Sequence, residues 1–240
     1  MIDLRMADLN FRINNRYNYL ESQCRDYIIP SNSSHAFQPD ICIQAEEEEI
    51  NQTLNKLSGF YHSYDYAESI VVYEKIGCQL PAFDAFIMHA SVICVDGQAF
   101  AFAAKSGIGK STHTRFWKEL FGERITVING DKPICRFEEN ELMAFGTPWC
   151  GKEGWNTNTK SPLKALCLLE RSDENRIYPV DGFEMLGTIM KHFYIPENRK
   201  IDMSKLMELV DRMLNVTKVY RLTVKKEISA ARVAAELLLQ

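Results

Sequence analysis

A glycine-rich segment that ends in lysine and serine is the first feature of the sequence with recognisable chemistry. It covers residues 105–111 and reads KSGIGKS. Glycine has no Cβ, so the backbone N–H groups around Gly107 and Gly109 can approach the oxygens of a polyphosphate closely. Lys110 adds a positive charge for the β- and γ-phosphates, and the Ser111 hydroxyl can ligate a magnesium ion. The combination predicts a P-loop of the Walker A type.

The residues around this segment fit a strand, loop and helix in that order. An apolar run at 99–104 precedes the loop and a helix is expected from about Lys110, so the positive end of the helix dipole faces the same anion. The strict pattern GxxxxGK(S/T) is broken only at its first place, which holds Ala104. A chance glycine turn is the alternative to a nucleotide site. The residues predicted to contact the nucleotide are Ser106, Gly107, Ile108, Gly109, Lys110, Ser111 and Thr112.

A carboxylate follows the next expected strand. Residues 125–128 form a short β-branched run, and Asn129, Gly130 and Asp131 come directly after it. A carboxylate just beyond a strand that follows the P-loop helix is where a second metal ligand belongs, and Asp131 is the candidate. An ordinary turn is the other interpretation, and both stay open.

Two basic residues further along the chain are additional candidates for phosphate or substrate contacts. Lys152 lies in a glycine-rich segment, residues 146–155, which also holds two of the three tryptophans. Such a segment suits a lid over a substrate or nucleotide. A rigid corner whose tryptophans fill the core is the alternative. Arg171 follows an apolar strand expected at 163–169.

Hydrophobic periodicity and turn signals predict the elements that position these residues. Two apolar runs within 86–104 flank Asp96 and Gly97, which predicts an antiparallel hairpin that leads into the P-loop. In an ordinary Rossmann or Ras-type sheet, the P-loop strand is instead reached through a helix. Further expected elements are a hairpin at 134–145, strands at 163–169 and 218–224, and helices at 111–121, 183–193, 203–214 and 229–239.

Composition limits the class of protein. The 240 residues include 46% hydrophobic and 25% charged residues, which is typical of a globular chain with a full core. The net charge of −4 argues against a nucleic-acid partner. No apolar run approaches the roughly 20 residues of a membrane helix, and the N-terminus lacks the apolar stretch of a secretion signal. We therefore expect a cytoplasmic protein without a membrane or nucleic-acid partner.

Several motifs together resemble a known superfamily. The sequence has HASVICVDG, SGIGKSTHTRFW, GDKP, GTPWCGKE and SPLKALCLLER, and a late VYRL followed by an alanine-rich helix. In these motifs it resembles the HPr kinase and ATP-type phosphoenolpyruvate carboxykinase superfamily, and more narrowly its short HPr kinase-related, carboxykinase-like bacterial proteins. The resemblance covers about residues 60–240.

The resemblance implies an α/β fold with α+β character. Its core would be of the P-loop carboxykinase and HPr kinase type, with a mixed, largely antiparallel sheet flanked by helices. Residues 61–240 would form the kinase-like nucleotide-binding domain. Residues 1–60 would form a β-rich or mixed extension packed on that core.

The same resemblance suggests residue roles. Lys110 and Ser111 would handle the triphosphate and its Mg²⁺, and Asp131 matches the second acid of a paired-aspartate motif. Gly130 stands where that motif has its first acid. His89 matches a histidine near the γ-phosphate, where it would bind metal or assist proton transfer. Without the family, a histidine at a strand start is also compatible with a core residue.

The sequence thus predicts an ATP- and Mg²⁺-dependent kinase that phosphorylates a serine-like hydroxyl. Lys110, Asp131 and His89 are the candidate catalytic residues, and Asp131 or His89 would accept the proton. The acceptor is a peptide, a protein side chain or a small molecule, and a homo-oligomer stays open. Because of Gly130, the alternative is a nucleotide-binding module that has lost catalysis and acts as a sensor or partner-binding protein.

Overall fold

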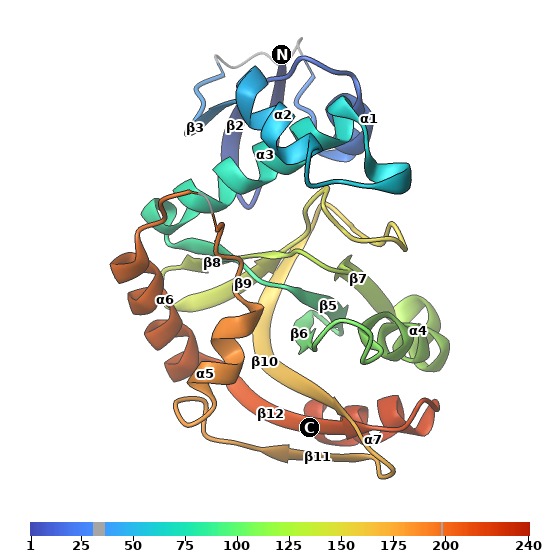
Figure 1. The fold of residues 1–240 in the computed structure, drawn as a ribbon. Helices are drawn as coiled ribbons and strands as arrows, with labels where there is room; N and C mark the ends of the chain where they lie inside the picture. Colours follow the sequence, from blue (N-terminus) through green and yellow to red (C-terminus); the bar gives the residue numbers. More distant parts are fainter. Residues whose placement is uncertain (31–36, 198) are drawn as a thin grey trace.

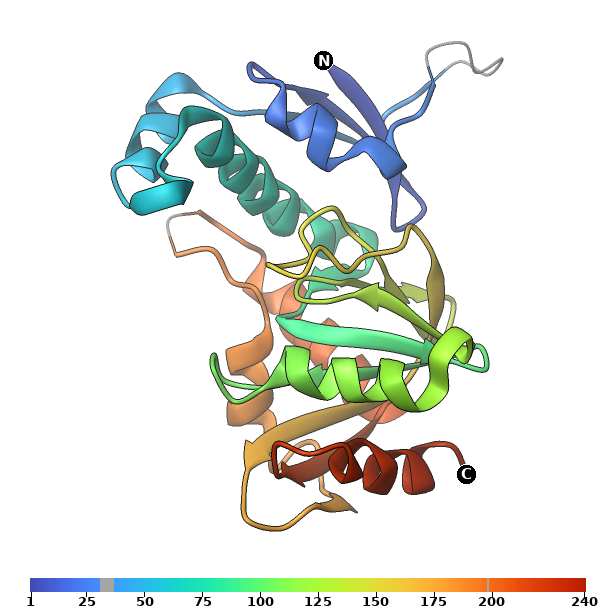
Figure 2. The same cartoon turned by 90° about the vertical axis from the view of Figure 1, so that its right-hand side faces the viewer.

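The computed structural model describes residues 1–30, 37–197 and 199–240. A smaller N-terminal unit is stacked on a larger unit that carries the rest of the chain (Figures 1 and 2). In the smaller unit, a sheet is formed in the order β1 (Ile2–Met6), β2 (Leu9–Asn14) and β3 (Ile41–Gln44). The helices of this unit are α1 (Tyr19–Gln23), α2 (Glu47–Leu54) and α3 (Tyr64–Gln79).

Helix α3 connects the two units. It packs against α1, α2 and β3 of the smaller unit. Its buried residues Val72 and Ile76 also belong to the same hydrophobic cluster as Ile134 and Phe145 of the larger unit. Apolar contact is therefore continuous across the boundary between the units. The division of the chain at residue 60 stays a prediction.

The larger unit is built on a curled mixed sheet in the order β4-β8-β9-β10-β6-β5-β7. Its long strand β10 (Lys160–Arg171) is antiparallel to β9 (Glu141–Phe145) at its start, and runs parallel to β6 (Gln98–Ala103) and β12 (Lys218–Val224) further along. The other strands are β4 (Ala85–Ile87), β5 (Ala90–Val95), β7 (Ile125–Asn129), β8 (Ile134–Glu138) and β11 (Arg176–Pro179). A mixed sheet flanked by helices is confirmed. A core of the carboxykinase and HPr kinase type stays a prediction.

The side chains of β6 alternate between two helical layers, as the twofold period of a strand requires. Its alanines belong to the cluster with α5 (Leu186–Ile189) and α6 (Met203–Val216). Phe100 and Phe102 pack on the opposite face with Trp117 of α4 (Lys110–Phe121) and with α7 (Ser229–Leu238). No helix within the described ranges is long and apolar enough to cross a membrane. Short 3₁₀ segments cover Arg25–Tyr27, Gly59–Tyr61, Leu80–Phe83, Gly122–Arg124 and Met190–His192.

Most elements expected from the sequence are confirmed. Strands β5 and β6 form the antiparallel hairpin, with Val95 opposite Gln98 and a turn at Asp96 and Gly97, whose φ angles are 49° and 79°. Strands β8 and β9 form the second hairpin. Helix α4 follows the glycine-rich segment, and β12 and α7 lie where the pattern predicts them. The local signals therefore place the P-loop-like segment correctly between a strand and a helix.

The first arm of the expected hairpin is interrupted before its middle. Its beginning, β4, pairs with β8, and only from Ala90 does the chain pair with β6. Between the two strands, the Met88 N–H donates to the Pro133 carbonyl at 3.2 Å and the His89 N–H donates to the His192 carbonyl at 2.7 Å. The backbone N–H of His89 is thus held by His192, which lies outside the hairpin of β5 and β6.

The helix expected at 183–193 is much shorter than predicted. Only Leu186–Ile189 is α-helical, and a 3₁₀ turn follows at Met190–His192. The chain then leaves the helix, because Phe193 bridges to Met88 and the Tyr194 N–H donates to the Ile87 carbonyl at 2.9 Å. This pairing places His192 beside His89.

A half-buried charge cluster joins α2 and α3 to the segment before α6. Glu49 accepts hydrogen bonds from Arg199 at 2.7 Å and from Lys75 at 2.6 Å, and Glu74 accepts one from Arg199 at 3.0 Å. Partial burial opposes ionisation of Glu49, but the bonds from Arg199 and Lys75 outweigh it and lower its pKa to about 2. A carboxyl group whose pKa is lower in the folded than in the unfolded chain stabilises the fold above its unfolded pKa.

We expect Glu49→Gln to reduce the free energy of unfolding near pH 7 by about 1–2 kcal/mol. The difference from the unmodified protein should shrink as the pH falls from about 4.5 towards 2, since Glu49 then becomes protonated. Urea unfolding at a series of pH values measures it. Glu48→Gln is the matched control, because Glu48 lies exposed on the same helix. A gap that stays constant with pH would contradict the role given to Glu49.

Candidate functional site

The glycine loop, residues 105–109, joins β6 to α4. Gly107 and Gly109 have φ angles of 80° and 120°, a region that favours glycine. The Ile108 N–H donates to the Lys105 carbonyl at 3.2 Å, and Gly109 is the N-cap of α4. The turn therefore depends on the glycines for its backbone angles, and it leads directly into the positive end of a helix of twelve residues.

Lys110 and Asp131 form an ion pair across the mouth of this loop. The Lys110 Nζ lies 3.0 Å from the Asp131 Oδ1, and the side chains are only 12% and 19% exposed. Burial lowers the pKa of Lys110, and the charge of Asp131 opposes this shift. The lysine of the loop and the carboxylate predicted as its partner therefore share one half-buried site.

His89 contacts the same carboxylate. Its Nε2 lies 2.9 Å from the Asp131 Oδ1, and its side chain is 46% exposed. A histidine with that exposure is not a core residue. The structure thus brings together the three residues that the sequence predicts to be catalytic.

Lys132 is a further partner of Asp131 that the sequence analysis missed. Its Nζ lies 2.5 Å from the Asp131 Oδ2. Burial would raise the pKa of Asp131, but the hydrogen bond from His89 and the charges of Lys132 and Lys110 hold it well below its usual range. Asp131 is therefore a firmly ionised carboxylate at neutral pH.

Asn129 sets the shape of the turn that carries Asp131. It is fully buried, and its Oδ1 accepts the N–H groups of Asp131 at 2.8 Å and Lys132 at 2.7 Å. Its Nδ2 donates to the carbonyl and hydroxyl oxygens of Thr147, both at 3.0 Å. An asparagine that bonds the backbone two and three residues ahead is a common turn device, so the Asn-Gly pair after the strand was the available signal. The hydrogen bonds of Asn129 therefore shape the turn that positions the Asp131 carboxylate.

Gly130 lies against another segment, with no space for a side chain. Its N–H donates to the Trp155 carbonyl at 2.8 Å. A Cβ built at Gly130 would lie 2.9 Å from the Cys150 carbonyl oxygen and 3.4 Å from that of Trp155. Real Cβ atoms essentially never come within 3.0 Å of such an atom. Gly130 is thus fixed by the packing of residues 150–155.

Part of residues 146–155 forms a rigid corner, and a role of the segment as a lid stays a prediction. Trp149 is buried, and its Nε1 donates to the Ser69 hydroxyl at 3.0 Å, as in a rigid corner. Lys152 is exposed, and it lines the same cavity as the glycine loop. The first half of the segment is therefore anchored in the core, and its tip lies at the mouth of the site.

The cavity at the glycine loop has a volume of about 570 Å³, and we call it the loop cavity. It is lined by His89, the loop, the start of α4, residues 130–132 and residues 151–153. Ser106, Gly107, Gly109, Lys110, Ser111 and Thr112 all line it. Ile108 instead lines a cavity of about 130 Å³ with Phe116 and a cavity of about 580 Å³ with His89, and Arg171 lines both of these cavities. Arg171 also donates to the Gly107 carbonyl at 3.1 Å and so supports the loop.

His192 is a second residue that the sequence did not reveal. Its side chain is buried, and burial together with the charges of His89 and Lys110 lowers its pKa to about 4. It is therefore neutral at physiological pH. Its backbone carbonyl holds the His89 N–H.

Comparisons with known proteins give a distant structural likeness. No family model matches the chain, and no curated protein sequence matches it. Among solved structures, the HPr(Ser) kinase/phosphatase from Coxiella burnetii matches with a TM-score of 0.36 and 12% identity, over 64% of this chain and 96% of that chain. The residue roles considered below accordingly rest on the geometry of this chain.

The packing at Gly130 predicts the outcome of a small substitution. We expect Gly130→Ala to reduce the free energy of unfolding by about 1–3 kcal/mol, because the new methyl group overpacks the Cys150 carbonyl. Gly187→Ala is the control, since a Cβ there meets nothing within 4 Å and alanine favours the helix. Urea unfolding of the two variants measures both effects. Equal stability of the two would show that residues 150–155 do not press on Gly130.

Proposed function

We propose that the chain binds ATP in the loop cavity and transfers its γ-phosphoryl group to a hydroxyl group. The observation that carries this proposal is the meeting of Lys110, Asp131 and His89 at the end of the glycine loop, where the Lys110 Nζ and the His89 Nε2 each lie within 3.0 Å of the Asp131 Oδ1. A cation, a carboxylate and an imidazole beside a glycine loop at the N-terminus of a helix are groups that phosphoryl transfer uses.

The charge of the loop cavity supports a polyphosphate ligand. Among the described residues that line it, the four lysines outnumber the two carboxylates, Asp131 and Glu153. The lysines are Lys105, Lys110, Lys132 and Lys152. Together with the positive end of α4, this excess attracts an anion.

Ser111 and Asp131 fit a magnesium ion in the chemistry of their donor atoms. Mg²⁺ prefers oxygen ligands and is usually held by one or two protein groups together with phosphates and waters. A hydroxyl and an ionised carboxylate that line the same cavity match that pattern. When bound, the ion would neutralise part of the charge of the transferred group.

The residues of the chain would act mainly by position and charge. Lys110 would exchange its bond with Asp131 for the β- and γ-phosphates, which frees the carboxylate to contact the acceptor hydroxyl. Asp131 or His89 would then accept the proton of that hydroxyl. A carboxylate held far below its usual pKa is a weak base, but phosphoryl transfer passes through a loose transition state that needs little proton removal in advance.

A nucleotide-binding module without catalysis is the second candidate. The feature that favours it is Gly130, which stands where a paired-aspartate motif would have its first acid. Gly130→Asp is a poor test of lost catalysis, because the new side chain would disturb the Cys150 carbonyl. The two candidates differ in one measurable property, the transfer of label from ATP to an acceptor.

The test uses γ-labelled ATP, Mg²⁺, the protein and a lysate of its own host, followed by identification of the labelled acceptor. We expect Lys110→Ala to reduce ATP binding and lower transfer at least about 100-fold, the scale of a lost transition-state cation. Arg115→Ala removes a charge from the exposed side of the same helix and is the control. Normal ATP binding and turnover by Lys110→Ala would refute the proposal. ATP binding without any labelled acceptor would favour the second candidate.

A further inference from the structure

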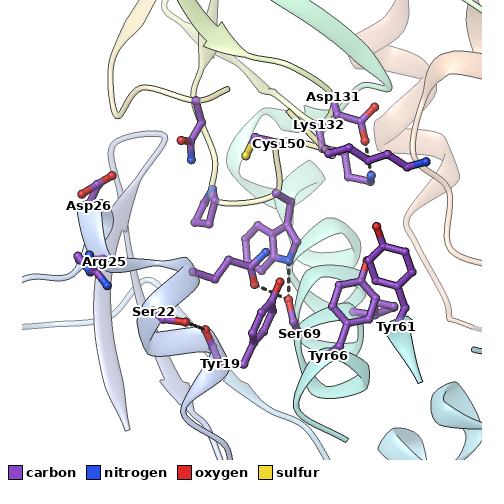
Figure 3. Close-up of a pocket in the computed structure, with 17 residues that line it drawn as sticks. Tyr19, Ser22, Arg25, Asp26, Tyr61, Tyr66, Ser69, Asp131, Lys132 and Cys150 are labelled. Carbon is purple, nitrogen blue, oxygen red and sulfur yellow. Dashed lines mark hydrogen bonds and ion pairs between the residues drawn. The ribbon is translucent and has the colours of Figure 1, made fainter. Parts of the chain in front are cut away.

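A second cavity lies on the other side of Asp131, between the two units of the chain (Figure 3). It has a volume of about 640 Å³, and we call it the interdomain cavity. The N-terminal unit contributes residues of α1, of the 3₁₀ turn that follows it and of α3, including Tyr19, Arg25 and Tyr66. The larger unit contributes residues 131–132, residues 148–152 and Asn156.

The two cavities meet at one wall. Asp131, Lys132, Gly151 and Lys152 line both of them. In Figure 3 the side chains of Asp131 and Lys132 lie at one end of the interdomain cavity, and those of Tyr61, Tyr66 and Tyr19 lie along it. A ligand in this cavity therefore reaches the carboxylate from a side that the glycine loop does not occupy.

A buried hydrogen-bond chain fixes the floor of the interdomain cavity. The Ser69 hydroxyl of α3 donates to the Gln23 Oε1 of α1 at 2.6 Å and accepts from the Trp149 Nε1 at 3.0 Å. Ser69 and Trp149 are both buried. Because one hydroxyl links α1, α3 and the loop beside Asp131, the cavity is preformed and its wall is held in register with the carboxylate.

We propose that the interdomain cavity binds the phosphoryl acceptor and that the acceptor is a short peptide segment presenting a hydroxyl side chain. This inference rests on the proposed function, since it places the second substrate of the same reaction. The acceptor hydroxyl would contact Asp131 from the interdomain side, opposite the phosphates held by Lys110. Reaction breaks the bond between the γ-phosphorus and its bridging oxygen, forms a bond from phosphorus to the hydroxyl oxygen, and passes the hydroxyl proton to Asp131 or His89.

Size and lining favour a peptide over a small alcohol. Cavities of about 300–1,000 Å³ enclose ligands of drug size, and a single small alcohol would leave most of this cavity to water. The walls offer tyrosine rings together with charges of both signs from Arg25, Asp26 and Lys152. Aromatic surfaces with interspersed polar groups suit a peptide backbone and mixed side chains.

The test measures peptide binding separately from catalysis. The probes are fluorescent pools of serine-containing pentapeptides, with free L-serine as competitor, in the presence of a non-hydrolysable ATP analogue. Ser22 is exposed at the end of α1 and lines the interdomain cavity, so Ser22→Trp fills part of it. Glu21→Trp is the matched control, because Glu21 is exposed on the same helix and is not among the residues that line the cavity.

We expect at least one pool to bind, Ser22→Trp to weaken that binding at least tenfold, and Glu21→Trp to leave it within about twofold. ATP-analogue affinity and the thermal midpoint should be unchanged in both variants. Peptide binding that is absent, unaffected by Ser22→Trp, or displaced by equimolar L-serine would overturn the proposal. Lys110→Ala separates this outcome from failure of the proposed function, since that variant should lose ATP and keep the peptide.

Discussion

The ion pair between Lys110 and Asp131 connects the glycine loop and α4 to the turn that follows β7. Lys110 begins α4 and belongs to the glycine loop, whereas Asp131 follows β7. Strands β6 and β7 are both neighbours of β5 in the sheet, so two antiparallel pairings fix the distance between the loop and the carboxylate. A half-buried pair of this kind strongly disfavours loss of either member, because the remaining charge would be buried alone.

A network of buried hydrogen bonds holds the turn that carries Asp131. Asn129 directs the backbone N–H groups of the turn, and Thr147 in turn holds Asn129. Residues 146–159 therefore have a structural role. In Figures 1 and 2 this connection between β9 and β10 lies between the two units. Its Trp149 reaches α3, while its Gly151 and Lys152 reach the loop cavity. The N-terminal unit is thus mechanically coupled to the site through a few buried polar contacts.

The sequence predicted those features that depend on short-range chemistry. Gly107 and Gly109 predict the loop between a strand and a helix, and the Asp96-Gly97 turn predicts its hairpin. What it could not predict depends on partners far along the chain. Lys132 could not be predicted as a partner of Asp131, because the sequence does not fix the direction of a lysine side chain next to an aspartate. His192 was missed because the expected helix at 183–193 gives way to pairing with residues 87–89. Nothing in the sequence around Gly130 indicates that the carbonyl of Cys150 lies where a side chain would start.

The packing around Gly130 changes the interpretation of this glycine. Seen as a missing acid, Gly130 suggests that an active site has decayed. In the structure, the space of a side chain at 130 is taken by residues 150–155, the same segment that brings Lys152 to the loop cavity and Cys150 to the interdomain cavity. A decayed site would be expected to leave a void or an unpaired charge at the lost group. Here the surviving carboxylate is hydrogen-bonded on both oxygens and the neighbouring backbone is packed and bonded. The contacts around position 130 are therefore complete without a second acid.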